Sequence, residues 1–417
     1  MISMLVTGIY NTADTYFVGK ISTQATAAVG LVFSVMAIIQ ALGFFCGHGS
    51  GNYLSRQLGS GNIREASEMA STGFAFALIL GVTVTALGLI FIRPIAFLIG
   101  ATETTLRDTI AYMRIILLGA PFMIGQFVIN NQLRFQGNAI YAMVGLMCGA
   151  VLNIGLDPLL ILVLGMGVSG AAIATVSGQL ISFLVLLLGT GKSGSITFSV
   201  RNVHINRHYL LEIVNGGAPS LFRQGLTSVS TLLLNHTAGS FGGDAAIAGM
   251  SIVNRTMMLI ASALIGFGQG YQPVCSYNYG AGLFKRVKQG FFFCVKYGVI
   301  FLCASSAVAF IFAPEIVEWF RNDPDVVRTG AEALRYQAVS LPLMGVTIIC
   351  NMMLQSSGKG VKASIAASAR SGLFFIPLII VLPRLFGLKG VMLSQPVADL
   401  FAMFLALPLA WSELKKM

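Results

Sequence analysis

The chain has 417 residues, of which 56% are hydrophobic and only 10% are charged, and its mean hydropathy is +0.82. A soluble domain of average composition carries about 25% charged residues, which its surface needs to stay in water. The composition therefore excludes a soluble protein and indicates a polytopic membrane protein. In so apolar a chain, the net charge of +11 marks basic loops beside anionic lipid rather than a nucleic-acid surface.

Apolar segments of about 20 residues, long enough to span a bilayer as helices, recur about twelve times. They lie near residues 1–19, 25–54, 66–92, 107–135, 138–163, 168–190, 207–241, 245–275, 286–313, 327–356, 361–386 and 389–412. The connections between them are too short to hold a soluble domain. We therefore expect an all-α polytopic membrane protein with about twelve transmembrane helices.

The basic residues are distributed unevenly over the connecting loops. The loops after even-numbered spans, together with the carboxyl-terminal tail, hold nearly twice as many Lys and Arg as the other loops. Loops rich in Lys and Arg normally face the cytoplasm. The sequence thus predicts a multi-pass protein of a cytoplasmic membrane with both termini inside and a basic cytoplasmic connector at residues 191–206.

The chain contains an internal repeat at an offset of 221 residues, the difference in numbering between Gly47 and Gly268. The same offset relates several motifs. They are Gly47–Gly49 and Gly268–Gly270, Gly59–Gly61 and Gly280–Gly282, Arg114 and Arg335, Pro121 and Pro342, Asn130 and Asn351, and Gly137 and Gly358. Six spans in each half place both halves in the membrane in the same sense, which is typical of transporters.

We expect two parallel six-helix lobes around a central cleft that carries the substrate. The predicted divisions are an N-lobe at 1–190, the connector at 191–206 and a C-lobe at 207–417.

Three carboxylates lie inside predicted spans rather than at their ends: Asp14, Asp157 and Asp399. A carboxylate at membrane depth is costly and points to a functional site. The structural alternative is an ion pair with a buried arginine such as Arg223 or Arg255.

Helix geometry brings several polar groups of the first half to a similar depth. At about 1.5 Å per residue, Asp14, Asp157, Thr175 and Tyr112 all lie in the outer half of the membrane. Asn153 shares a helix face with Asp157 at i, i+4.

Tyr10 and Asp14 repeat the i, i+4 spacing on the first span, and Pro158 frees a backbone carbonyl beside Asp157. Carboxylate, amide, hydroxyl and carbonyl oxygens suit a hard cation, and buried carboxylates also suit a proton. Sodium and proton coupling are both chemically available. The second half lacks this cluster, and the role of Asp399 is open between substrate contact and structural pairing.

Several short motifs resemble those of multidrug and toxic compound extrusion (MATE) transporters. The motifs are Tyr10–Thr15 leading to Val18–Gly19, Arg56–Asn62, Asn278–Gly282 and Asn153–Pro158. The Asn153–Pro158 motif is similar to helix five of the DinF-like or MepA-like bacterial branch.

The resemblance implies cation-coupled antiport of cationic or amphipathic drugs across a bacterial cytoplasmic membrane. It implies a cation site, for Na⁺ if the coupling ion is sodium, at Asp14, Asn153, Asp157 and Thr175. It also implies substrate contacts at Tyr10 and Asn130. To these we add Tyr112 and Asp399 as candidate substrate contacts, from their depth in the membrane.

We expect no cofactor beyond the coupling H⁺ or Na⁺, no nucleic-acid partner, a monomer and no enzymatic activity. Two alternatives stay open. One is a lipid-linked saccharide flippase of the same superfamily, although such proteins usually have more spans and a more basic cavity. The other is an integral membrane enzyme, which would need catalytic groups near an interface.

Overall fold

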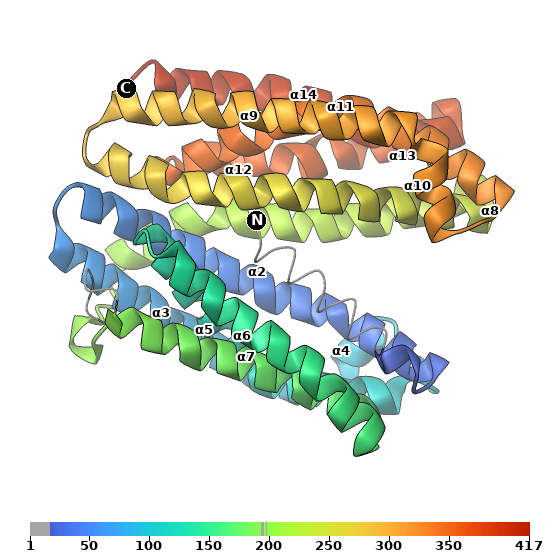
Figure 1. Cartoon of the computed structure of the whole chain (residues 1–417), viewed down its shortest axis with the longest axis horizontal. Coiled ribbons are helices and arrows are strands. Elements are labelled where there is room, and N and C mark those ends of the chain that lie inside the picture. The colour runs from blue at the N-terminus through green and yellow to red at the C-terminus, as the bar shows by residue number, and fades with distance from the viewer. Residues whose placement is uncertain (1–16, 193–195, 197) are drawn as a thin grey trace. The chain divides into compact units, whose positions relative to one another are not determined.

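The computed structural model describes residues 17–192, 196 and 198–417, and Figure 1 traces them as a series of long helices. The first predicted span, 1–19, lies almost wholly outside the described residues. The elements in chain order are α2 (Thr23–Gly59), α3 (Ile63–Ile90), α4 (Ile92–Leu98), α5 (Leu106–Phe135), α6 (Ala139–Pro158), η1 (Leu159–Val163), α7 (Gly167–Lys192), η2 (Val200–Asn202), α8 (Arg207–Gly280), α9 (Phe284–Ile311), α10 (Ala313–Phe320), α11 (Pro324–Ser356), α12 (Gly360–Ser368), η3 (Ala369–Leu373), α13 (Phe375–Phe386) and α14 (Leu388–Leu414).

The long helices confirm the predicted all-α membrane fold. Among the described residues, 10 helices are long and apolar enough to cross a membrane, and their bounds fall within a few residues of the predicted spans. The helix α8 accounts for two of those spans, because its 74 residues would extend about 110 Å, far more than a bilayer core of about 30 Å. Its backbone breaks at Gly243, between the two predicted segments 207–241 and 245–275.

The break at Gly243 depends on glycine. The residue has φ 64° and ψ −159°, a conformation that side chains with a Cβ rarely adopt. The chain leaves the helical path there without a longer loop. The sequence therefore separates the two spans with a single residue.

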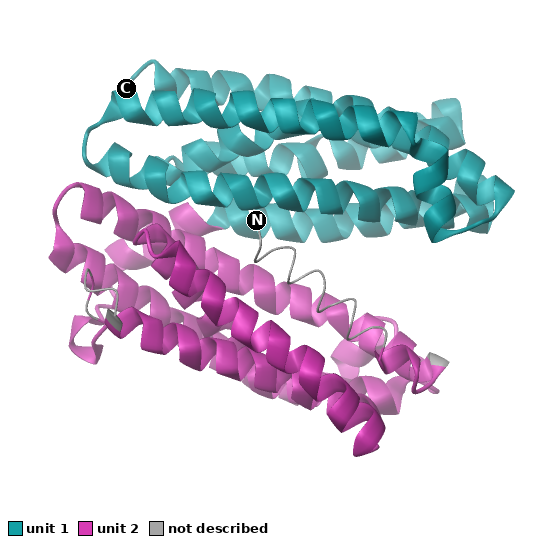
Figure 2. Cartoon of the chain, viewed as in Figure 1, with its two compact units in different colours: residues 1, 218–417 teal, residues 2–217 magenta. Residues whose placement is uncertain are grey.

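The chain divides into two compact units, coloured separately in Figure 2. Of the described residues, those up to 217 form unit 2 and residues 218–417 form unit 1. The division falls inside α8, so the first turns of this helix pack with unit 2 although α8 begins just after the predicted connector. The lobe boundaries at 190 and 206 stay a prediction.

The first turns of α8 are attached to unit 2 by polar contacts. Glu212 pairs with Arg56 of α2 at 2.9 Å, and the Tyr209 hydroxyl donates to Glu68 of α3 at 2.7 Å. A Cβ on Gly216 would lie 3.1 Å from the Cα of Gly49, so the helices α8 and α2 approach closely here. These contacts explain why residues 207–217 belong with the helices that precede them.

One helix lies at the centre of each unit. In unit 2, α5 packs against α2, α3, α6 and α7; in unit 1, α11 packs against α9, α10, α12 and α14. Both central helices contain a proline at the repeat offset, Pro121 in α5 and Pro342 in α11. Proline removes a helical hydrogen bond and favours a bend.

Matching hydrogen bonds confirm the internal repeat. The Asn130 side chain donates to the carbonyl oxygen of Ala142 at 2.7 Å, and Asn351 donates to that of Ala363 at 2.6 Å. At the same offset, Thr85 donates to Leu117 and Ser306 donates to Ala338, both at 2.6 Å.

The turns repeat as well. Gly61 and Gly282 have φ 81° and 72°, and Gly137 and Gly358 have φ 87° and 74°. The glycines that recur at the constant offset of 221 residues therefore lie in turns that need a positive φ.

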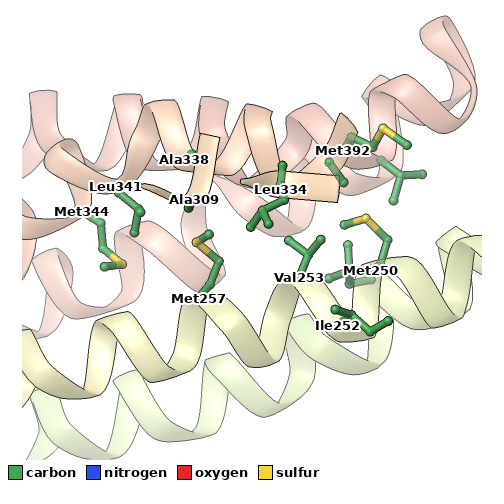
Figure 3. Packing of buried hydrophobic residues seen from close by; sticks show 14 of the residues in the cluster. Met250, Ile252, Val253, Met257, Ala309, Leu334, Ala338, Leu341, Met344 and Met392 are labelled. Carbon is green, nitrogen blue, oxygen red and sulfur yellow. The ribbon is translucent and has the colours of Figure 1, made fainter. Parts of the chain in front are cut away.

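The core of unit 1 is rich in methionine (Figure 3). Met250, Met257, Met344 and Met392 point into one cluster between α8, α11 and α14, together with branched aliphatic residues such as Leu334. Methionine is flexible and polarisable, so it fills irregular gaps and tolerates rearrangement. Such a core suits a unit that changes shape better than a rigid packing of branched residues does.

Besides the 3₁₀ turn η2 in the connector, sequence reasoning missed four short elements. Two are short helices at equivalent places in the repeat, α4 after α3 and α10 after α9. The others are π-helical turns, η1 directly after Pro158 and η3 in the span that contains α12 and α13. Wide turns of this kind are common at functional sites, and each lies beside a buried carboxylate or its partner.

Candidate functional site

The end of α6 carries the two polar groups expected to bind a cation. Asp157 is fully buried and Asn153 is 3% exposed. Their side chains meet across one helical turn, with the Asn153 amide donating to Asp157 Oδ1 at 3.5 Å. Pro158 then ends the regular helix and the π-helical turn η1 follows, so the carboxylate lies where the backbone is irregular.

Two of the expected site residues, Tyr10 and Asp14, lie outside the described residues. Their participation in the site stays a prediction. Asp157 makes a further interaction in addition to its contact with Asn153.

A small cavity lies between α5, α6 and α7 in unit 2. Its volume is about 30 Å³, and both Asn153 and Thr175 line it. The structure thus brings together, from the consecutive helices α6 and α7, two of the four residues expected at the cation site. The rest of the lining consists of Gln126, Phe127, Leu146, Gly149, Ala150, Gly178, Gln179 and Ser182.

Sequence reasoning missed Gln126 and Gln179 as members of this site. Both are buried, with 3% and 8% of their surface exposed. The available signal was helix periodicity, because Gln179 follows Thr175 at i, i+4 and therefore lies on the same face of α7. A search restricted to charged residues passes over such neutral amides.

The cavity is placed by close packing of α6 against α7. A Cβ on Gly178 would lie 2.7 Å from the carbonyl oxygen of Gly149 and 3.1 Å from the Cβ of Asn153. Small residues at facing positions let membrane helices approach closely. This approach places the amide of Asn153 directly beside α7, where Thr175 and Gln179 lie.

The other expected residues of the first half lie in different surroundings. Tyr112 is fully buried in the core of unit 2, and its hydroxyl lies 4.0 Å from Met36 Sδ. Asn130 is 4% exposed and its amide nitrogen is committed to the carbonyl oxygen of Ala142. Neither residue lines the cavity that contains Asn153 and Thr175.

A comparison of Asn130 with Asn351 separates a structural role from substrate contact. Replacing either residue with Leu removes one buried side chain–backbone hydrogen bond, so each change should cost about 0.6 kcal/mol, and at most about 1.7 kcal/mol. Thermal unfolding of the purified variants measures this cost. If Asn130→Leu also lowers drug affinity while Asn351→Leu does not, Asn130 contacts the substrate; equal effects would assign it a structural role only.

Asp399 lies in unit 1 and forms an ion pair. Its carboxylate is 2% exposed and accepts from Arg370 Nε at 2.7 Å, Gln395 Nε2 at 2.9 Å and Ser340 Oγ at 3.0 Å. The partner is Arg370 of the π-helical turn η3, and neither Arg223 nor Arg255 takes that place. This geometry favours the structural alternative for Asp399, since both carboxylate oxygens are occupied.

The sequence of this chain is similar to those of known multidrug export proteins. Its sequence is 30% identical over 414 residues to the multidrug export protein MepA of Staphylococcus haemolyticus (strain JCSC1435), covering 99% of this chain and 91% of that protein. It is 31% identical over 401 residues to MepA of Staphylococcus saprophyticus subsp. saprophyticus, covering 96% and 88%.

Solved structures give the same result. A multidrug resistance MATE family transporter of the MOP superfamily, in an outward-facing conformation, matches with a TM-score of 0.93 at 27% identity, covering 100% of this chain and 94% of that one. A MOP superfamily transporter from Pyrococcus furiosus, described as having a binding pocket of reverse polarity, matches with a TM-score of 0.93 at 27% identity, covering 100% and 93%.

These relatives are transporters, so the chain is a membrane transporter and not an enzyme. The model of the family described as MatE matches residues 1–159 and 219–381, one segment in each half of the internal repeat. The chain therefore belongs to the MatE family.

Proposed function

We propose that the chain exports cationic or amphipathic drugs across a bacterial cytoplasmic membrane in exchange for H⁺ or Na⁺. The observation that carries this proposal is the fully buried Asp157 beside Asn153, at the end of a helix that also lines an oxygen-rich cavity. The export of drugs by relatives that align over nearly the whole chain supports the choice of substrate.

The coupling follows from the energy of a buried charge. A carboxylate inside the membrane is costly unless a cation or proton neutralises it. Binding of H⁺ or Na⁺ at Asp157, with Asp14 as the proposed second carboxylate, removes this cost and favours a conformation that holds drug weakly. By reciprocal linkage, a drug that favours the other conformation must weaken cation binding.

The basic loops and tail face the cytoplasm, so both termini lie inside, and one chain suffices for transport. The two units alternately expose the substrate site to either side of the membrane. No cofactor takes part beyond the coupling ion.

Transport in liposomes tests the proposal. Vesicles containing the purified protein are loaded either with Na⁺ or with acidic buffer, and ethidium is added outside. An antiporter should accumulate the dye as the cation leaves, and collapse of the gradient with an ionophore should stop accumulation. Protein-free vesicles provide the control.

Absence of dye movement under both gradients would overturn the proposal. The same vesicles separate it from a saccharide flippase, because a flippase would move a fluorescent lipid-linked sugar between leaflets and leave ethidium outside. Conversion of a lipid into a product would instead indicate an enzyme.

A further inference from the structure

Arg223 is a buried cation at membrane depth. It lies roughly midway between Arg207, where α8 begins, and the break at Gly243. Its Nη1 atom is buried and has no hydrogen-bond partner among the described residues, and no ion pair within that part of the chain includes it. A charge inside the membrane is costly, so such residues are rare and mark functional sites. Arg223 therefore needs a partner that the described part of the chain does not supply.

The face of α8 that carries Arg223 packs against the π-helical turn η3. Thr227, one helical turn further on, donates to the carbonyl oxygen of Arg223 at 2.7 Å, and its Oγ1 lies 3.5 Å from Ser371 Oγ. A Cβ on Gly372 would lie 2.7 Å from Leu226 Cδ1. Residues at i, i+3 and i+4 share a helix face, so Arg223 lies on the same side of α8 as these contacts. Arg223 thus belongs to the surroundings of η3, the kind of wide turn that is common at functional sites.

The carboxylate that contacts η3 does not neutralise Arg223. Both oxygens of Asp399 already accept hydrogen bonds, which come from Arg370, Gln395 and Ser340. Asp399 is also the only carboxylate inside the predicted spans of unit 1 rather than at their ends. Unit 1 therefore carries a surplus of positive charge at membrane depth, whereas the candidate cation site lies in unit 2. The two units differ in polarity, and unit 1 suits an anionic group.

We propose that Arg223 is a specificity-determining residue that pairs with a carboxylate on the substrate, so that the protein recognises zwitterionic amphipathic drugs through unit 1. The inference rests on the proposed drug export and names a substrate class. A guanidinium presents planar N–H donors that match the two oxygens of a carboxylate, and it stays charged at physiological pH. Its position midway along the span favours a group brought in by a substrate over a lipid headgroup, which lies at the membrane interface.

Binding of two matched dyes to the purified protein tests the proposal. Rhodamine 110 carries a free carboxylate at neutral pH, and rhodamine 123 is its methyl ester with the same cationic ring system. Each dye is titrated with protein and followed by fluorescence polarisation. Arg223→Met should lower the affinity for rhodamine 110 at least about 10-fold, as loss of a hydrogen bond to a charged group does, and should not weaken the binding of rhodamine 123. Absence of rhodamine 110 binding by the wild type, or equal effects of the substitution on both dyes, would overturn the proposal.

Thermal unfolding separates this role from a structural one. Breaking a buried ion pair destabilises a protein strongly, whereas removing an uncompensated charge does not. Without dye, the melting temperature of Arg223→Met should therefore equal or exceed that of the wild type, and rhodamine 110 should raise it only in the wild type. A large decrease without dye would assign Arg223 to a structural pair and contradict substrate recognition.

Arg255 offers a matched control on the same helix. It also lies inside a predicted span of unit 1, but it is exposed. Arg255→Met removes the same charge and should leave the preference between the two dyes unchanged. An equal loss of rhodamine 110 affinity in Arg255→Met would attribute the effect to the general positive charge of unit 1 and remove the assignment to Arg223.

The outcomes distinguish this inference from the proposed function. Gradient-driven accumulation of rhodamine 123 by a protein whose Arg223 makes no difference to either dye would retain drug export and overturn the inference. Arg223-dependent binding of rhodamine 110 by a protein that moves neither dye under any gradient would retain the carboxylate site and overturn drug export.

Discussion

Replacing Asp157 with Asn is expected to abolish cation-coupled drug efflux while the protein still folds and enters the membrane. Asn keeps the shape of the side chain and its contact with Asn153, but it can neither neutralise a cation nor take up a proton. Coupling free energies between two ligands are typically about 1–3 kcal/mol, or about 5–150-fold in affinity. Without the charge, the cation should no longer change drug affinity. The wild type should show a change of about 5–150-fold, and the variant should show none.

Dye accumulation in liposomes and cation-dependent drug binding measure this loss. Asp325→Asn is the matched control, because this carboxylate is 73% exposed near the start of α11 and, among the described residues, its ion pair is with the exposed Arg328. The control should transport at the wild-type rate. Full coupled efflux by Asp157→Asn would falsify the cation site.

The helices were predictable from the sequence because the bilayer imposes one strong rule. Segments of about 20 apolar residues must be helices, and the predicted segments match the observed long helices, including the two parts of α8 on either side of Gly243. The short helices α4 and α10 could not be found in this way. With 7 and 8 residues, they are too short to produce a hydropathy signal.

Part of the candidate site was predictable for a related reason. Asp157 is a rare charge in an apolar segment, and Asn153 shares its helix face, so sequence spacing alone relates them. Gln126 and Gln179 could not be identified in this way. Their convergence depends on how α5 and α7 are rotated against α6, and the close contact of Gly149 with Gly178 brings α7 against α6.

The pairing of Asp399 illustrates the same limit. The sequence showed a buried carboxylate that needs a partner, but it offered several arginines at membrane depth. Selection of Arg370 follows from the π-helical turn η3, a backbone feature that hydropathy does not report. Composition thus identifies the costly group, and only tertiary packing identifies what stabilises it.

Removal of one member of the Arg370–Asp399 pair should strongly destabilise unit 1. Asp399→Leu leaves the Arg370 guanidinium, only 29% exposed, without its carboxylate, and Arg370→Met leaves the carboxylate without its cation. Breaking a buried pair in this way typically costs about 3–5 kcal/mol. Thermal or denaturant unfolding of each purified variant measures the cost.

The double variant Arg370→Met with Asp399→Leu decides whether the pair is structural. Because replacing both charges with apolar groups of similar volume is often neutral or stabilising, the double variant should recover most of the stability that either single variant loses. If Asp399 only pairs with Arg370, the double variant should also keep its drug affinity. Recovery of stability with lost drug affinity would instead indicate that Asp399 contacts the substrate and that Arg370 positions its carboxylate. Failure to recover stability would show that the two charges act independently, contrary to their 2.7 Å contact.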